Sequence, residues 1–351
     1  MAIIQNQLDL TRFQDLSAAV PTAPLRSTML GELGFFEVRP LTTKTVFIPR
    51  TIEQDFNPTD YAWGAVPQTL GIDGKGYITL PVPHFPVQDA IFPKDLDGAF
   101  NWDQIGQGQQ PETLVSVRSR KMKKIAQGFA NLWEKSRMEL IINSKAYAPN
   151  GTLAQSYGST VDYNVEFGVT QQTKTMSLND QTVDVLAEVE PIIAYVQDNL
   201  KNGQVCGQFV AICGSTFFSK LVSHPYVKDA GKYVNYSQSE DLLLGRLGNG
   251  GTGLDARFRA FRFGGVLWLE NRAQMTATEA RLFPIDVEGM FVTFVSPSER
   301  KFGTVNTSAN EIYYFEKLVD EIAEQFQIVA ETNVLHACMY PQAIVKVTIT
   351  P

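Results

Sequence analysis

The chain is poor in the residues from which disulfide frameworks and metal centres are built. Its 351 residues include three cysteines and three histidines. Cys206, Cys213 and Cys338 are odd in number and show no Cys-x-x-Cys or Cys/His ligand spacing. We therefore expect reduced thiols, as in a cytoplasm, with no disulfide and no zinc or other metal.

The chain also lacks a surplus of positive charge and long apolar runs. It has 30 basic and 37 acidic residues, a net charge of −7, whereas proteins that grip nucleic acid by its phosphates need clustered positive charge. No stretch approaches 18 apolar residues, and the first residues lack the basic start and apolar run of a signal peptide. We expect a protein that neither spans a membrane nor is exported.

Motifs of catalysis are missing or out of context. No G-x-x-x-x-G-K-[ST] loop is present. The segment from Gly248 to Gly253 fits G-x-G-x-x-G, but the alternating residues 257–263 that follow are typical of a strand, not of the helix that a dinucleotide site requires. His336 and Cys338 share a strand face without an evident orienting group, which favours a packed pair over a nucleophile and its base. We expect no catalytic residue, no cofactor and no enzyme.

What the sequence does contain is a very long helical pattern. Residues 111–147 predict one helix of about 37 residues, roughly 55 Å long at 1.5 Å per residue. Pro111 suits its first turn and Pro149 to Gly151 suit its end. An apolar stripe runs along it at three- and four-residue steps, at Met122, Ile125, Phe129, Leu132, Trp133, Leu140 and Ile141. Such a rod serves as a strut and not as a catalytic element.

A run of positive charge spreads around the first half of this helix, at Arg118, Arg120, Lys121, Lys123 and Lys124. Such runs most often form a solvated or salt-bridged face. The sharper hypothesis is contact with an acidic neighbour or an acidic scaffold, for which Arg120 and Lys123 are the candidate residues.

Segments before the helix resemble extended limbs. Residues 1–43 predict an arm lying along a surface, in which Phe35 and Phe36 would lower solubility if left bare. A strand is expected near Lys44 to Ile48, followed by a long loop with aromatic residues and glycines. Tyr61, Trp63 and Tyr77 disfavour disorder in this loop, and we expect it to lie on a neighbouring molecule.

Mixed α/β patterns follow the long helix. Residues 157–169 resemble a hairpin, and residues 182–200 have helical spacing, with Pro191 expected to kink that helix or limit its first turn. A strand at 208–212, a helix at 215–223 and strands at 257–263 and 266–270 come next. Strand patterns return between residues 312 and 350 and are expected to pair beside the long helix. The fold class is α+β.

The order and spacing of several short segments resemble the major capsid protein E family of phage lambda and related prophages. The segments span about 300 residues and are, in chain order, Leu41 to Phe47, Val82 to Asp89, Glu166 to Val169, Cys213 to Phe218, Val222 to Pro225, Phe261 to Val266, Phe283-Pro284, Gly289 to Phe291, Val305 to Thr307 and Pro341 to Val347. Ser296 to Glu299 and Ser308 to Glu311 depart from the pattern common in relatives.

The resemblance implies the tailed-phage capsid fold of the Hong Kong ninety-seven type, with an N-arm, an E-loop, a spine helix, and peripheral and axial domains. The implied division is 1–43 N-arm, 44–50 peripheral-domain strand, 51–82 E-loop, 83–174 peripheral domain including the spine helix 111–147, 175–310 axial domain and 311–351 C-terminal strands of the peripheral domain.

The same resemblance implies a structural function. Pentamers and hexamers of the chain would form the icosahedral shell of a tailed bacteriophage around its double-stranded DNA, assembled in the bacterial cytoplasm. Implied partners are sister copies, a separate scaffold protein, the portal, possible decoration proteins, and DNA by non-specific proximity only. The residues expected at inter-subunit contacts are Phe35, Phe36, Tyr61, Trp63, Lys75, Tyr77, Arg120 and Lys123. Two rival interpretations stay open at this point: a nucleotide-dependent enzyme using Gly248 to Gly253, and a tail-tube or cement protein.

Overall fold

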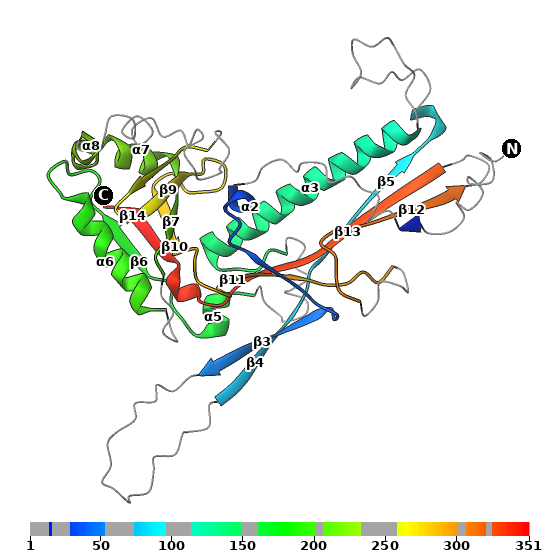
Figure 1. The fold of residues 1–351 in the computed structure, drawn as a ribbon, viewed down its shortest axis with the longest axis horizontal. Helices are drawn as coiled ribbons and strands as arrows, with labels where there is room; N and C mark the ends of the chain where they lie inside the picture. The colour runs from blue at the N-terminus through cyan, green and yellow to red at the C-terminus, as the bar shows by residue number, and fades with distance from the viewer. Residues whose placement is uncertain are drawn as a thin grey trace, which may run out of the picture.

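The structure is a computed structural model that describes residues 14–15, 29–52, 74–95, 114–148, 161–200, 206–232, 258–300, 307–320 and 325–350. The molecule is elongated. An α/β lobe lies at one end, a long helix lies over a separate sheet that reaches to the other end, and a two-stranded ribbon projects from the middle (Figure 1). Within the described ranges, no helix combines the length and the apolar character needed to cross a membrane.

The long helix α3 spans Leu114–Asn143. The predicted apolar stripe is confirmed, because Met122, Ile125, Phe129, Trp133, Leu140 and Ile141 are all buried. The predicted end at residue 147 is wrong. The helix stops at Asn143 because Ser144 adopts a left-handed conformation with φ 53°, and Lys145 then bridges to Asp162. Its predicted start at residue 111 lies outside the described residues.

The first half of α3 covers a sheet built around one long strand. β13 is flanked by β12 and β5 along its first half and pairs with β11 along its second half. β1 and β2 add the two outer strands, and β2 runs parallel to β11. The strands are β1 Gln14–Asp15, β2 Glu37–Pro40, β5 His84–Ile91, β11 Phe291–Val295, β12 Tyr313–Asp320 and β13 Gln325–Cys338.

The lobe is formed by the second sheet and three helices. The sheet order is β6-β14-β10-β7-β9-β8, and all five residues of β7 and of β9 are buried. Its strands are β6 Thr173–Met176, β7 Phe209–Cys213, β8 Ala260–Phe263, β9 Val266–Glu270, β10 Glu279–Pro284 and β14 Val345–Ile349. Its helices are α6 Val185–Asp198, α7 Ser215–Ser223 and α8 Pro225–Lys232.

Two glycine positions explain tight connections in the lobe. Gly214 joins β7 to α7, and a Cβ there would lie 2.0 Å from the Thr276 carbonyl oxygen. Gly264 and Gly265 form the turn between β8 and β9 with φ of 60° and 75°, as a two-residue hairpin turn requires. Glycine thus permits a close approach of the backbone at Gly214 and positive φ angles at Gly264 and Gly265.

The hairpin predicted at residues 157–169 is wrong over its described part. Tyr163–Phe167 forms the short helix α5, which Asp162 caps at its start and Gly168 closes in a left-handed conformation. The helix predicted at 182–200 is confirmed as α6, which continues through Pro191. Pro191 has no N–H to donate to the Ala187 carbonyl. Both residues are exposed, so water can donate to that carbonyl instead.

Strand pairing divides the chain differently from the expected domain boundaries. β12 and β13 lie beside α3 as expected, but β14 lies in the lobe sheet. β11, expected among residues 175–310 of the axial domain, lies in the first sheet. The chain changes sheets at two tight turns, one containing Gly289 with φ 68° and one formed by the short helix η3, Pro341–Ala343. The naming of these parts as peripheral and axial domains stays a prediction.

Candidate assembly surfaces

The ribbon is formed by β3, Thr45–Ile52, and β4, Gly74–Pro81, paired antiparallel from Thr45 with Pro81 to Ile52 with Gly74. Alternate residues of a strand point to opposite faces. On one face Val46, Ile48 and Leu80 are 3, 1 and 1 % exposed and belong to the main core. This face fixes the ribbon to the body of the molecule.

The opposite face of the ribbon is aromatic and open to solvent. Phe47 and Tyr77 are 62 and 65 % exposed. Phe47 pairs with Thr79, and Pro49 pairs with Tyr77, so the two rings are diagonal neighbours on one face. Exposed aromatic side chains are typical anchors of a protein interface. Tyr77 was expected at an interface from the sequence, whereas Phe47 was missed, although its place between Val46 and Ile48 was a readable signal.

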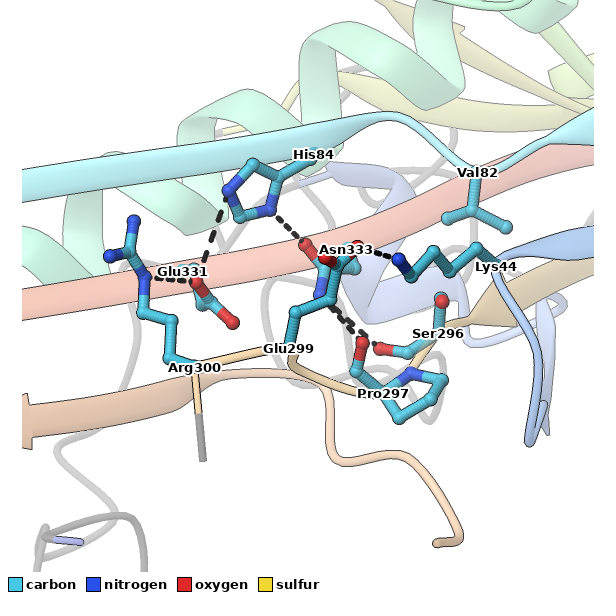
Figure 2. A pocket seen from close by; sticks show the side chains of 9 residues that line it. All are labelled: Lys44, Val82, His84, Ser296, Pro297, Glu299, Arg300, Glu331 and Asn333. Carbon is cyan, nitrogen blue, oxygen red and sulfur yellow. Dashed lines mark hydrogen bonds and ion pairs between the residues drawn. The ribbon is translucent and has the colours of Figure 1, made fainter. Parts of the chain in front are cut away.

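The ribbon is rooted in a polar pocket of about 320 Å³ (Figure 2). Nine residues line it, from the two chain segments that flank the ribbon, from β5 and β13, and from the segment after β11: Lys44, Val82, His84, Ser296, Pro297, Glu299, Arg300, Glu331 and Asn333. The Glu331 side chain is 1 % exposed, and the Arg300 Nε donates to its Oε2 at 2.6 Å. A buried carboxylate requires such a partner, so this pair holds the segment after β11 against β13.

The hydrogen bonds in this pocket determine how His84 is oriented. The Asn333 Nδ2 donates to the carbonyls of Ser296 and Pro297 at 3.4 and 3.3 Å. The Asn333 Oδ1 is then the acceptor for the His84 Nδ1, at 2.6 Å. The His84 Nε2 consequently faces the Glu331 Oε2, at 3.9 Å (Figure 2). Lys44, directly before the ribbon, also pairs with Glu299. These contacts together hold the base of the ribbon, β5 and the segment after β11 around one pocket.

Phe35 and Phe36, the arm residues that the sequence predicted at an interface, pack within their own chain. The rings of Phe35 and Phe36 lie 4.7 Å apart and contact Phe291 at 4.9 and 5.4 Å. The Arg137 guanidinium lies 5.0 Å from the centroid of Phe36. This packing gives both rings a role within the subunit that the sequence did not indicate. Their contact with a neighbouring copy stays a prediction.

His336 and Cys338 are both buried in β13. The His336 Nδ1 is 2.9 Å from the Thr293 Oγ1. Burial, assisted by the charge of Arg137, holds the pKa of His336 well below its usual value. Burial raises the pKa of the Cys338 thiol to about 12. A neutral imidazole and a protonated thiol have no activated nucleophile between them, which agrees with the packed-pair interpretation.

Two side chains of the basic run on α3 form ion pairs with neighbouring strands. The Arg118 Nη2 lies 2.8 Å from the Glu316 Oε1, and the Lys121 Nζ lies 3.1 Å from the Asp89 Oδ1. Burial raises the pKa of the Glu316 carboxyl, and Arg118 opposes this shift. Arg120 and Lys123 are exposed. The run is therefore partly salt-bridged within the chain, and the two candidate residues are at the surface.

The structure does not describe the side chains of three residues predicted at inter-subunit contacts. Tyr61 and Trp63 lie outside the described residues, as does the glycine segment from Gly248 to Gly253. Lys75 lies in β4 opposite Thr51, and its side chain is outside the description. Among the described residues, no cluster of three or more His, Cys, Asp or Glu side chains is arranged to hold a metal ion.

Comparison with known proteins identifies the family. The model of the family described as phage major capsid protein E matches residues 12–349. A major capsid protein of Pseudomonas phage KPP10 is 34 % identical over 356 residues, covering 98 % of this chain and 97 % of that protein. A major capsid protein of Salmonella phage Felix O1 is 24 % identical, covering 95 % of each chain.

A solved structure supports the fold. The crystal structure of a putative capsid protein from a prophage of E. coli CFT073 aligns with a TM-score of 0.59 at 10 % identity, covering 97 % of this chain and all of that one. The fold is the tailed-phage capsid fold that the resemblance implied. The chain belongs to the phage major capsid protein E family, whose members are structural subunits of phage heads.

Proposed function

We propose that many copies of this chain assemble as pentamers and hexamers into the icosahedral shell that encloses the double-stranded DNA of a tailed phage. The observation that carries the proposal is the two-faced ribbon, whose inner face is buried in its own subunit and whose outer face exposes Phe47 and Tyr77. A side chain that remains exposed in one subunit gains burial only from another molecule. A shell of identical copies supplies that molecule at every position.

The outer face of the ribbon anchors on a neighbouring subunit. Burial of apolar surface stabilises by roughly 25 cal/mol per Å², and association costs reduce the net gain at each contact. Several weak contacts per subunit then add up through multivalency. Tyr61, Trp63 and Lys75, in the same limb, are further candidates from the sequence.

Assembly takes place in the bacterial cytoplasm with a separate scaffold protein, and the finished shell carries a portal and, in some cases, decoration proteins. The net charge of −7 supports an inner wall that leaves DNA free to move. Tight, salt-sensitive binding of DNA to empty shells would contradict this part of the proposal.

Electron microscopy of the expressed protein, with and without its scaffold protein, tests the proposal. Closed round particles or capsomer rings are expected. Rods or surface decorations would instead support a tail-tube or cement protein, and a monomer that never forms particles with the phage assembly proteins would refute the shell function.

A double variant, Phe47→Ser with Tyr77→Ser, tests the role of the ribbon. It should fold as the parent does and lose particle formation, because both side chains are exposed in the single subunit. The matched control is Val165→Ser, which removes an apolar side chain that is 75 % exposed on α5. Equal particle yields from the double variant and the control would show that the outer ribbon face is not an anchor.

A further inference from the structure

The helix α3 is a positively charged rod in a negatively charged chain. It contains seven basic and two acidic residues, whereas the rest of the chain contains 23 basic and 35 acidic residues. Arg118 and Lys121 pair within the subunit, but Lys123, Lys124 and Lys135 are exposed. A positive surface of this kind favours an acidic partner.

A groove of about 480 Å³ follows one flank of α3 where the helix overhangs β5. Its floor includes Phe85, Ile125 and Leu132, and Lys124 lies on its rim. Gly128 lies in the middle of this flank, and a Cβ there would meet no atom within 4 Å. Glycine in a helix interior is unfavourable, and no contact within the chain requires it. Its absence of a side chain instead permits another backbone to approach closely.

The outward face of α6 has the complementary character. Asp184, Glu190 and Asp198 are exposed on it, and residues 181–198 contain no lysine or arginine. Ala187 and Ala194, seven residues or about two helical turns apart, are exposed between these acids. Small residues allow two helices to pack at short distance.

We infer that the flank of α3 around Gly128 is the docking surface for the outward face of α6 from a second copy of this chain. Lys124 and Lys135, which share this side of the helix with Gly128, then meet the acids, and Ala187 and Ala194 pack over Gly128 and the apolar floor of the groove. The inference rests on the proposed shell function and names one of its contacts. α6 lies on the outer side of the lobe, whereas the groove lies along the part of α3 that extends away from the lobe (Figure 1). The contact therefore joins different surfaces of two copies, head to tail.

Charge reversal on each surface, followed by mixing, tests this contact. One variant carries Lys124→Glu and Lys135→Glu, and the other carries Glu190→Lys and Asp198→Lys. Each alone places like charges together, and we expect at least a tenfold loss of association by light scattering and sedimentation. In an equimolar mixture every contact pairs opposite charges again, so association should return with alternating copies in native mass spectrometry. Failure of the mixture to associate would overturn the inference.

A fold defect and a contact defect are separated by cross-linking. The native Cys206, Cys213 and Cys338 are all buried, so introduced cysteines should react selectively. A Lys124→Cys variant mixed with a Glu190→Cys variant should form disulfide-linked dimers under mild oxidation, more readily than either variant alone. The control replaces Lys124→Cys with Lys228→Cys, on the exposed surface of α8, and should give few dimers. Equal yields would contradict the contact.

The glycine gives an independent measurement. Gly128→Leu adds a bulky side chain at the centre of the docking surface and should reduce association at least tenfold while the circular dichroism spectrum is unchanged. If the parent protein forms shells and neither Gly128→Leu nor the charge reversals affect them, the inference fails while the shell function stands. If the parent forms no shells but the cross-link appears, the contact stands and the shell function fails.

Discussion

The lobe and the ribbon use the same structural unit, the β-strand, in opposite ways. In the lobe every residue of β7 and β9 is buried, so both faces of each strand are consumed within the subunit. In the ribbon Val46 and Ile48 are buried but Phe47 between them is not. The central strands of the lobe are therefore complete within a single subunit, whereas the ribbon has one face that only another molecule can cover. Stability should depend more on these lobe strands, and assembly more on the outer face of the ribbon.

The largest effect is expected from a change in the lobe. Gly214→Ala places a Cβ 2.0 Å from the Thr276 carbonyl oxygen and 2.6 Å from the Ala277 Cα, so backbone must move. We expect a loss of about 3 kcal/mol in the free energy of unfolding, measured by urea denaturation. A loss below about 0.5 kcal/mol would show that the β7–α7 connection tolerates side chains and would weaken the contrast with the ribbon.

A pair of substitutions in β3 compares the two faces of the ribbon. Ile48→Ala removes a side chain that is 1 % exposed and should cost about 2 to 4 kcal/mol of unfolding free energy. Phe47→Ser removes one that is 62 % exposed and should change the stability of the monomer by less than about 0.5 kcal/mol. Denaturation of both variants under monomeric conditions measures the difference. Similar losses would mean that the ribbon has no inner and outer face in solution.

The pH dependence of the unfolding free energy tests whether the buried His336 in β13 is neutral in the folded protein. The pKa of His336 is held well below 6.5 in the folded protein, so below pH 6.5 the unfolded chain binds a proton that the folded chain excludes. Unfolding free energy should fall by about 1.4 kcal/mol per pH unit from 6.5 towards the folded pKa.

The variant His336→Asn isolates this contribution. The raised pKa of Glu316 gives a slope of opposite sign above pH 4.5, but it is common to both proteins and cancels in their difference. Denaturation between pH 5.0 and 6.5 should show a shallower loss on acidification in the variant. Parallel curves would indicate that His336 is accessible to protons in the folded state.

The smallest effect is expected from Gly128→Ala on the exposed flank of α3. A Cβ there meets nothing, and alanine is the better helix former, so unfolding free energy should rise by about 0.5 to 1 kcal/mol. Chemical denaturation of the monomer measures it. The two variants compare a glycine that the fold of the subunit requires, Gly214, with one that it does not require, Gly128. A lower unfolding free energy for Gly128→Ala would contradict this distinction.

Periodic elements could be predicted from the sequence because their pattern is local. The stripe from Met122 to Ile141 follows the helical period, and α7 was predicted with the bounds at which it is found, Ser215 to Ser223. The hairpin near residue 163 was wrong because Tyr163, Val165 and Phe167 alternate like a strand. The Asp162 cap and Gly168, which favour a helix, were the better signals.

Long-range polar contacts could not be predicted in this way. The strand patterns between residues 312 and 350 did not indicate that one strand, β13, runs unbroken from Gln325 to Cys338. Its later part contains Glu331, Asn333 and His336, residues that are unusual in a buried strand. Their partners, among them Arg300 and Thr293, come from distant segments, and a single sequence carries no local signal for such pairs. The pocket at the ribbon root was missed for the same reason.

The continuity of β13 limits where the subunit can bend. This strand is clamped by β5 and β12 at one end and by β11 at the other, and the chain then enters the lobe sheet as β14 after a few residues. Two connections between β13's sheet and the lobe are short, the turn at 339–344 and the turn at Gly289. A tilt of the lobe against this sheet must therefore change the backbone at both turns together, as well as along the longer connection from α3 to β6.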